Sequence, residues 1–423
     1  MQPKDSQIDR GPERERINYL NTESIKMRDP SEPTIAISLS GGGARAIAFH
    51  LGCLRALHDA GLLAKTEVLS CVSGGSVIGA IYVTHDGDFE SFDARVRELL
   101  LKGLVRPAFR TAFTSREGVR AILCRAGLLT RRLTRFALAP VRWIVSGGFA
   151  LAGIAPSERV VTHVPRRYAS RTTILAETLD ALLFEGKTLK DIGDRKPKFV
   201  AVAAELRTGT AFYFSPEESG SWRFGKINPD RIPVARAVAA SAAYPLLLPA
   251  LDDDYIFNKS DGSARSERVT LTDGGIYDNL GLAPLWPDRD PAISVAIPKP
   301  DIIIACRAGY GLRFGMPTVT FLGRMKASFY TTLDRAQNAA LKRLYDLQGA
   351  GKLQAIVLPY LGQADHRLSC APNDLVKREE VDAYPTDFRA MSGEWIERLA
   401  KRGAQVTLAV LEEHHQELLK NQN

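Results

Sequence analysis

A serine early in the chain stands in a pattern that can hold a nucleophile. The stretch Cys71-Val72-Ser73-Gly74-Gly75 follows an apolar segment that predicts a strand at 66–71, and an apolar segment that predicts a helix begins at residue 76. A serine on such a sharp strand-to-helix turn projects its hydroxyl above the sheet, and small neighbours permit the turn. The pattern G-x-S-x-G is met at Ser73 and Gly75, whereas Cys71 replaces the first glycine.

Three consecutive glycines, Gly41–Gly43, lie between a predicted strand at 34–39 and a predicted helix at 44–60. Glycine lets backbone N–H groups approach an anion, and the helix N-terminus adds a favourable dipole. Adjacent parallel strands would place this loop and Ser73 at the same edge of the sheet. Its N–H groups would then stabilise a developing oxyanion by ~3–4 kcal/mol each.

Two other interpretations of the glycine loop stay open at this point. The loop satisfies G-x-G-x-x-A, which is the pattern of dinucleotide-binding turns. Those turns need an acidic residue at the end of the second strand to hold a ribose, and the second predicted strand has none there. The loop can also be a tight turn that binds nothing.

A serine hydroxyl needs a general base, and the sequence offers two kinds. His366 is the one histidine that follows the serine at the distance seen in α/β-hydrolases. His50 is expected to be structural, and His414 and His415 are expected to be solvated on a charged C-terminal helix. The carboxylate alternative is Asp273, which ends a predicted strand before two glycines. An Asx-turn that merely stops the strand is the bland alternative there.

The elements that must position these residues alternate between strand and helix. This alternation predicts an α/β fold, a mainly parallel central sheet covered by helices on both faces. Helical periodicity also predicts a long helix at 318–347 and one or two helices at 392–420. Further strands and a hairpin are predicted at 199–206, 210–214, 268–272, 302–306 and 355–359.

Together these segments resemble the patatin-like phospholipase family. The matching residues are Ser40–Ala46 for the glycine-rich loop, Val72–Gly75 for the nucleophile elbow and Asp273–Gly275 for the acid, with Ala235–Pro245 similar to the stretch before that acid. The resemblance covers roughly residues 33–285. Ala46 and Cys71 depart from the family by replacing glycines, and neither replacement removes a reacting group.

The resemblance implies a three-layer sandwich with a helical C-terminal part, and a Ser–Asp dyad that uses no histidine, no metal and no cofactor. Ser73 would attack the acyl carbonyl and Asp273 would accept its proton. Arg45 would support the loop or contact a phosphate. The implied oxyanion donors are the N–H groups of Gly41, Gly42, Gly43 and Gly74.

Residues 101–171 carry the basic excess of the chain. They contain 14 Lys and Arg against two acids, Glu117 and Glu158, which makes the segment +12 in a chain of net charge +8. Anionic headgroups attract such residues by ~1 kcal/mol each. We expect a lid or docking element for an anionic phospholipid surface, rather than a solvated face or a nucleic-acid patch. Its apolar anchors are Phe109, Phe113, Phe136, Trp143, Ile144 and Phe149.

Length and composition bound the remaining possibilities. The chain has 423 residues, 45% of them hydrophobic and 25% charged, which excludes a disordered or fibrous protein. Five widely spaced cysteines without a CxxC pair favour a reduced compartment and no cysteine zinc site. We expect a charged arm at 1–32 without a signal peptide, one acyl hydrolase domain at 33–423, and a cytoplasmic protein at the membrane periphery. Residues 136–155 are expected to be interfacial or buried in protein rather than membrane-spanning.

The predicted function is hydrolysis of ester bonds in phospholipids or lysophospholipids through an acyl-enzyme. A histidine-dependent esterase or thioesterase using His366 is one alternative, and a catalytically idle membrane-binding scaffold is another. The sequence leaves the oligomeric state open.

Overall fold

The computed structural model describes residues 32–138, 165–193, 195–245, 247–259, 262–290, 294–309, 316 and 318–420. Within them, a compact unit begins at Thr34 and contains the elements discussed below. The expected arm at 1–32 lies almost entirely outside the described residues, as does most of the segment at 136–155. None of the described helices combines the length and the apolar character that crossing a membrane requires.

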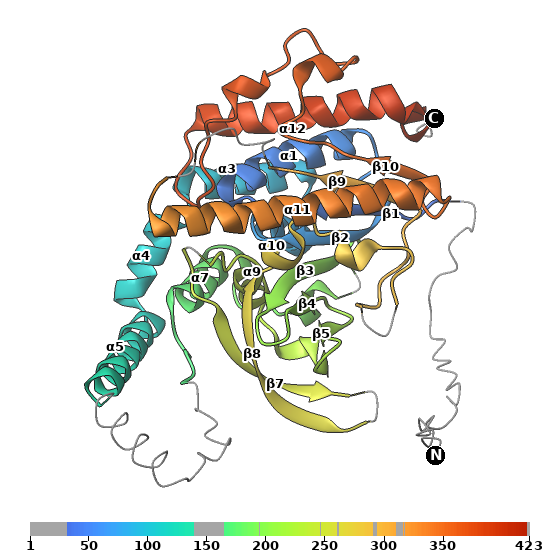
Figure 1. Cartoon of the computed structure of the whole chain (residues 1–423). Helices are drawn as coiled ribbons and strands as arrows, with labels where there is room; N and C mark the ends of the chain where they lie inside the picture. The colour runs from blue at the N-terminus through green and yellow to red at the C-terminus, as the bar shows by residue number, and fades with distance from the viewer. Residues whose placement is uncertain are drawn as a thin grey trace, which may run out of the picture. The chain divides into compact units, whose positions relative to one another are not determined.

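A single mixed sheet forms the centre of the compact unit (Figure 1). Within the described residues it has ten strands, and its first half is parallel in the order β10 (Ala355–Val357), β9 (Ile302–Cys306), β1 (Ile35–Leu39), β2 (Thr66–Val72) and β3 (Lys198–Glu205). The second half is antiparallel and contains β4 (Thr210–Phe214), β5 (Ser219–Ser221), β6 (Gly225–Ile227), β7 (Leu251–Asn258) and β8 (Ala264–Asp273).

Apolar residues on both faces explain why the parallel strands lie inside. All five residues of β1 are buried, and alternate residues belong to different cores: Ile37 and Leu39 pack on one face, and Ala36 packs on the other. A strand buried on both faces reads as a continuous apolar run, which is the pattern of its sequence.

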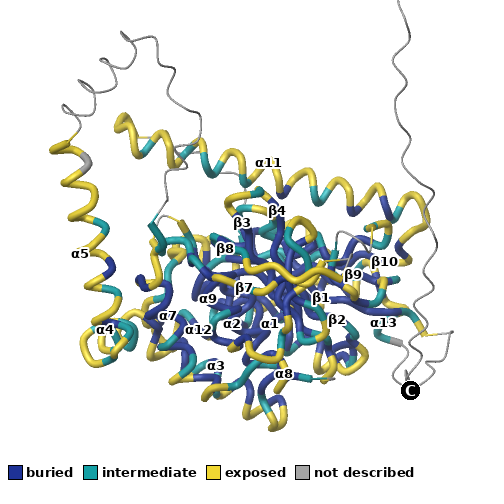
Figure 2. Tube along the Cα trace, turned by 90° about the horizontal axis from the view of Figure 1, so that it is seen from below, coloured by how far each residue is buried: buried dark blue, intermediate teal, exposed yellow. Residues whose placement is uncertain are grey.

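Helices cover the two faces of the sheet and make three layers. One face is covered by α1 (Gly43–Asp59), α2 (Gly74–Thr84), α3 (Phe89–Lys102), α9 (Val234–Ser241) and α12 (Gly393–His414). The other is covered by the second half of α11 (Phe321–Gly349), through Leu344 and Leu347. Figure 2 shows α11 on one side of the strands and α1, α2 and α12 on the other. The predicted α/β three-layer fold with a helical C-terminal part is confirmed.

Six further helices complete the described part. They are α4 (Val105–Thr114), α5 (Arg116–Ala137), α7 (Arg171–Leu179), α8 (Leu189–Ile192), α10 (Gly275–Asp278) and α13 (Gln416–Lys420). Of these, α7 and α8 contribute apolar residues to the core beneath α1 and α9. The predicted C-terminal helices at 392–420 are therefore α12 and α13, and the long helix predicted at 318–347 is α11.

The register of three strands brings two distant parts of the chain together. Val72 at the end of β2 pairs with Val202 of β3, and the next β3 residue, Ala203, pairs with Asp273. β4 occupies one side of β3, so β2 and the antiparallel β8 share the other side and end facing each other. Ser73 and Asp273 thus lie close together beside β3, at the junction where the two strands end.

Candidate active site

Ser73 sits on a strained turn between β2 and α2. Its φ of 51° and ψ of −117° lie in a region that residues with a side chain rarely adopt. Its N–H donates to the hydroxyl of Ser241 at 3.1 Å, and the Ser241 hydroxyl in turn donates to the carbonyl of Val202 at 2.6 Å. Because that donation uses the one hydroxyl proton of Ser241, the 2.7 Å contact between Ser76 and Ser241 must have Ser76 as donor.

The glycines after Ser73 are required by close backbone approach. A Cβ at position 74 would lie 2.4 Å from the carbonyl oxygen of Gly43, and one at position 75 would lie 2.2 Å from that of Leu39. Cys71 is accommodated in place of the usual glycine because Gly79 leaves room for it: a Cβ at position 79 would lie 2.4 Å from the Cys71 sulfur. The turn expected around Ser73 is therefore formed despite the departure at position 71.

The glycine loop brings the N-terminus of α1 against the N-terminus of α2. Gly42 and Gly43 have φ values of 151° and 63°, the left-handed region that favours glycine. Gly43 and Gly74 are the first residues of the two helices, and the first N–H groups of a helix have no acceptor inside it. The positive ends of two helix dipoles thus converge beside Ser73.

Gly41 differs from the expectation that it donates to an oxyanion. It borders the cavity that holds Ser73, but its N–H donates to the carbonyl oxygen of Asn279 at 3.1 Å. This hydrogen bond occupies the N–H. Gly41 therefore holds the loop against the segment after Asp273 and leaves Gly42, Gly43 and Gly74 as the candidate donors.

The dinucleotide interpretation of the loop finds no support. The N–H of Ala44 at the start of α1, which a pyrophosphate would use, donates to the carbonyl oxygen of Asp387 at 2.7 Å. A Cβ at Gly43 would lie 2.5 Å from the same oxygen. Protein backbone already fills this part of the helix N-terminus.

Asp273 is only 4% exposed, and its carboxyl has an unusual acidity. Burial raises its pKa from 3.8 to about 6, against the lowering effects of the Ser73 side chain and of the Gly275 N–H. That N–H donates to Oδ1 at 2.7 Å. The other oxygen, Oδ2, is buried and has no hydrogen-bond partner among the described residues, so it is available to accept a proton.

Ser73 and Asp273 line one cavity of about 120 Å³. The N-terminal half of α11 crosses it, and the described residues of its lining contain no histidine. Apolar, aromatic and charged side chains surround the pair, including Leu247, Ile276, Phe329, Tyr330, Leu333, Arg45, Arg307, Asp334 and Asp387.

Arg45 is buried and supports the loop. Its guanidinium donates to the carbonyl oxygens of Ala308 at 3.1 Å and Tyr384 at 3.4 Å. Of the two roles expected for Arg45, these contacts favour loop support. The same loop is fixed by the Ser40 hydroxyl, which accepts the Ala308 N–H at 2.8 Å.

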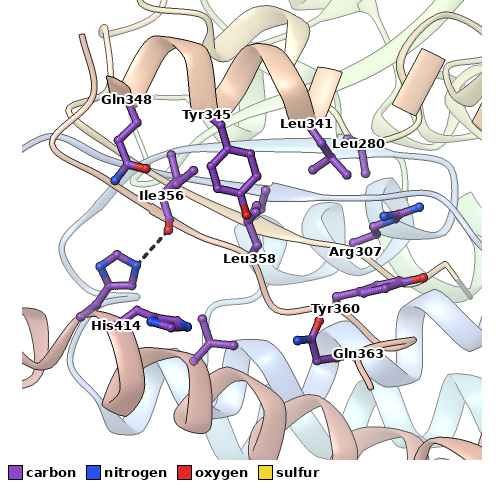
Figure 3. Close-up of a pocket in the computed structure, with 13 residues that line it drawn as sticks. Leu280, Arg307, Leu341, Tyr345, Gln348, Ile356, Leu358, Tyr360, Gln363 and His414 are labelled. Atoms are coloured by element: carbon purple, nitrogen blue, oxygen red, sulfur yellow. Dashed lines mark hydrogen bonds between the residues drawn. The ribbon is translucent and has the colours of Figure 1, made fainter. Parts of the chain in front are cut away.

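The histidines weighed in the sequence analysis do not line this cavity. His366 is exposed in a short turn and does not line the cavity, and His50 is buried with Nε2 2.9 Å from the Ser40 carbonyl oxygen. His414 is exposed, as expected. The expectation for His415 is wrong: this residue follows the last residue of α12, is buried, and has Nε2 2.9 Å from the carbonyl oxygen of Ile356 in β10. His414 and His415 line a separate cavity of about 580 Å³, and Figure 3 shows His414 at its border.

Two supporting residues escaped the sequence analysis. Ser241 lies in the stretch Ala235–Pro245 that carried part of the family resemblance, and that resemblance is the signal that could have pointed to it. Asn279 follows the predicted acid by six positions, and no pattern in the sequence marks its carbonyl as the acceptor for the glycine loop.

The fold and the site together define an α/β protein of the patatin type. Residues 37–286, more than half of the chain, match the patatin-like phospholipase family, and the chain belongs to that family. Human cytosolic phospholipase A2 gamma is 34% identical to it over 87 residues, which are 20% of this chain and 16% of that protein.

Similar solved structures are more distant in sequence. Human GIVD cytosolic phospholipase A2 superimposes with a TM-score of 0.50 at 14% identity, over 92% of this chain and 60% of that one. VipD from Legionella pneumophila gives a TM-score of 0.39 at 15% identity, over 91% of this chain and 67% of that one. The chain spans less than two thirds of the length of the human proteins.

Proposed function

We propose that this protein hydrolyses ester bonds of phospholipids or lysophospholipids with a Ser73–Asp273 dyad. The observation that carries the proposal is the proximity of a strained, buried serine and a buried carboxylate where β2 and β8 end facing each other, beside two converging helix N-termini. Family membership supports a lipid acyl hydrolase as the class of activity.

The chemistry would proceed in two displacements through an acyl-enzyme. The Ser73 oxygen attacks the ester carbonyl while its proton passes to Asp273 Oδ2. The N–H groups of Gly42, Gly43 and Gly74 stabilise the oxyanion. As the carbon–oxygen bond of the leaving group breaks, the alcohol takes the proton from Asp273. Water then attacks the acyl-enzyme, again losing its proton to Asp273, and the fatty acid leaves as Ser73 regains a proton.

A labelling experiment separates this mechanism from its rivals. A fluorophosphonate probe should label the wild-type protein and the control Ser369→Ala, whose serine lies on the surface, but not Ser73→Ala. Release of fatty acid from phosphatidylcholine and lysophosphatidylcholine should be lost in Ser73→Ala and Asp273→Asn. It should survive in His366→Ala.

Other outcomes favour the alternatives. Loss of turnover in His366→Ala with retention in Asp273→Asn would indicate the histidine-dependent esterase. A folded wild-type protein that is neither labelled nor active on either lipid would indicate the idle membrane-binding scaffold.

We further propose that the basic insertion docks the enzyme on an anionic phospholipid surface at the membrane periphery. In its described part, α4 has no buried residue and α5 presents a largely exposed surface (Figure 2). Phe109 and Phe113 are 67% and 69% exposed, with their rings 4.7 Å apart, among several arginines. Trp143, Ile144 and Phe149 lie outside the described residues. A helix of this kind lies in the membrane interface and binds through apolar and basic residues together.

Vesicle sedimentation tests the docking surface. We expect binding to vesicles of phosphatidylcholine with phosphatidylglycerol, weakened by salt, and weaker binding to phosphatidylcholine alone. The double variant Phe109→Ser, Phe113→Ser should bind less, whereas Ile256→Ser, at an equally exposed position on β7, should not. Equal binding to both vesicle types would contradict the proposal.

A further inference from the structure

A second cluster of reactive side chains lies in the core between α1, β9 and α12. His50 and Cys53 are three residues apart on α1, so they share one face of the helix, and Cys306 ends β9. All three side chains are fully buried or nearly so. Their ligating atoms all lie within 4.8 Å of one another. The proposed hydrolysis makes no use of any of them.

The hydrogen bond of His50 fixes which of its ring nitrogens is free. Nε2 lies 2.9 Å from the carbonyl oxygen of Ser40, and a carbonyl can only accept, so Nε2 carries the proton. In a neutral ring, Nδ1 then presents a lone pair. Nδ1 is buried and has no hydrogen-bond partner within the described chain. Histidines that bind metals are commonly oriented in this way, with the second nitrogen donating to a backbone carbonyl.

We propose that His50 Nδ1, Cys53 Sγ and Cys306 Sγ bind a divalent metal ion of the zinc type. An imidazole and two sulfur ligands are the donors that zinc prefers. Binding would release two thiol protons to solvent, and two thiolates with a divalent cation make a site without net charge. Such a site suits its surroundings, because a neutral group is far less costly than a charged one in an apolar core.

The geometry needs only a small adjustment. Zinc–sulfur and zinc–nitrogen distances of about 2.3 and 2.0 Å in a tetrahedron place the ligand atoms roughly 3.4–3.8 Å apart. Each pair of ligand atoms would therefore move closer by at most about 1.0–1.4 Å from the 4.8 Å limit. The three protein ligands leave one tetrahedral position for a water.

The ion would brace the residue that precedes the glycine loop. Ser40 contacts the ligand set twice: its carbonyl accepts from His50, and its N–H donates to the carbonyl of Cys306 at 3.2 Å. The role is thus structural and independent of the proposed hydrolysis, so either proposal can fail without the other.

Metal titration of the full-length protein tests the site. The protein is made metal-free with a chelator and reductant, and Co²⁺ or Zn²⁺ is added both to the folded protein and during refolding, because the site is buried. We expect one ion per chain, thiolate-to-cobalt absorption that Zn²⁺ abolishes, and a higher melting temperature with Zn²⁺. Cys53→Ala and Cys306→Val should weaken binding by at least about 100-fold, and the exposed control Cys370→Ala should bind like the wild type.

Two further measurements keep the result unambiguous. Far-ultraviolet circular dichroism of the metal-free variants shows whether each has folded, and Cys306→Val keeps an apolar side chain of similar size in case Cys53→Ala does not fold. The proposal is overturned if the wild-type protein takes up no metal under either condition. It is equally overturned if folded variants bind the metal as tightly as the wild type, or if Cys53 and Cys306 remain joined by a disulfide after treatment with the reductant.

Discussion

The substitution Asp273→Asn tests the proposed role of the buried carboxylate in both activity and stability. Only the ionised carboxylate can take a proton from Ser73, and its pKa is about 6. Hydrolysis of a water-soluble ester by the wild-type protein should therefore fall tenfold per pH unit below about 6 and level off above it. An asparagine cannot accept the proton, so the variant should hydrolyse the ester about 10²- to 10⁴-fold more slowly. Its rate should not fall further below pH 6.

The same pKa predicts how the free energy of unfolding depends on pH. The carboxyl has a higher pKa in the folded state, about 6 against its ordinary 3.8, so the folded protein binds more protons between these values. The contribution of Asp273 to stability is therefore fully present below about pH 4 and is lost as the pH rises to 6. The difference of about two pKa units corresponds to about 3 kcal/mol.

Urea denaturation between pH 4 and 8 measures this effect. The free energy of unfolding of Asp273→Asn, relative to that of the wild type, should rise by about 3 kcal/mol between pH 4 and 6 and change little above pH 6. The amide can also add a difference that does not depend on pH. Asp59→Asn, on the exposed end of α1, is the matched control and should show no comparable change. A pH-independent difference between Asp273→Asn and the wild type, together with an activity profile flat from pH 4 to 8, would refute the reasoning.

Two further substitutions test the support of the site. Ser241→Ala removes the hydroxyl that accepts from the Ser73 N–H, and it should destabilise the protein by about 2 kcal/mol or more because buried polar groups lose their partner. Urea denaturation measures the loss, and an unchanged midpoint would contradict the prediction. Gly74→Ala places a Cβ against the Gly43 carbonyl and should lower kcat on a soluble ester by about 100-fold or more, whereas Gly393→Ala, which meets nothing within 4 Å, should leave kcat unchanged.

Much of the fold could be predicted from the sequence because its parallel half is built from local signals. The apolar runs at β1, β2 and β9 and the glycines after them mark strands that end at one edge. The position of Asp273 at the sheet edge is predicted from a strand that ends on an acid before two glycines, whereas its partnership with Ser73 is implied by the family resemblance. Its physical cause is the pairing of β8 with β3, a contact between segments that no local pattern specifies.

What the sequence could not supply are the contacts that depend on the tertiary fold. The loss of Gly41 as a donor follows from a backbone hydrogen bond to Asn279, which any residue at that position could form. The burial of His415 follows from its packing against β10, although it lies in a charged stretch. A search for short cysteine spacings misses the cluster of His50, Cys53 and Cys306, because a helix and a strand that are far apart in the sequence meet there.

The hydrogen bonds that fix the glycine loop to the C-terminal part determine where this protein can be truncated. The family match ends at residue 286, yet Arg45 and the start of α1 rest on the carbonyl oxygens of Ala308, Tyr384 and Asp387. A fragment that stops at the family boundary would keep Ser73 and Asp273, the proposed dyad, and lose the backbone that fixes their surroundings. The smallest portion able to work as a unit therefore reaches nearly a hundred residues further along the chain than sequence similarity alone would suggest.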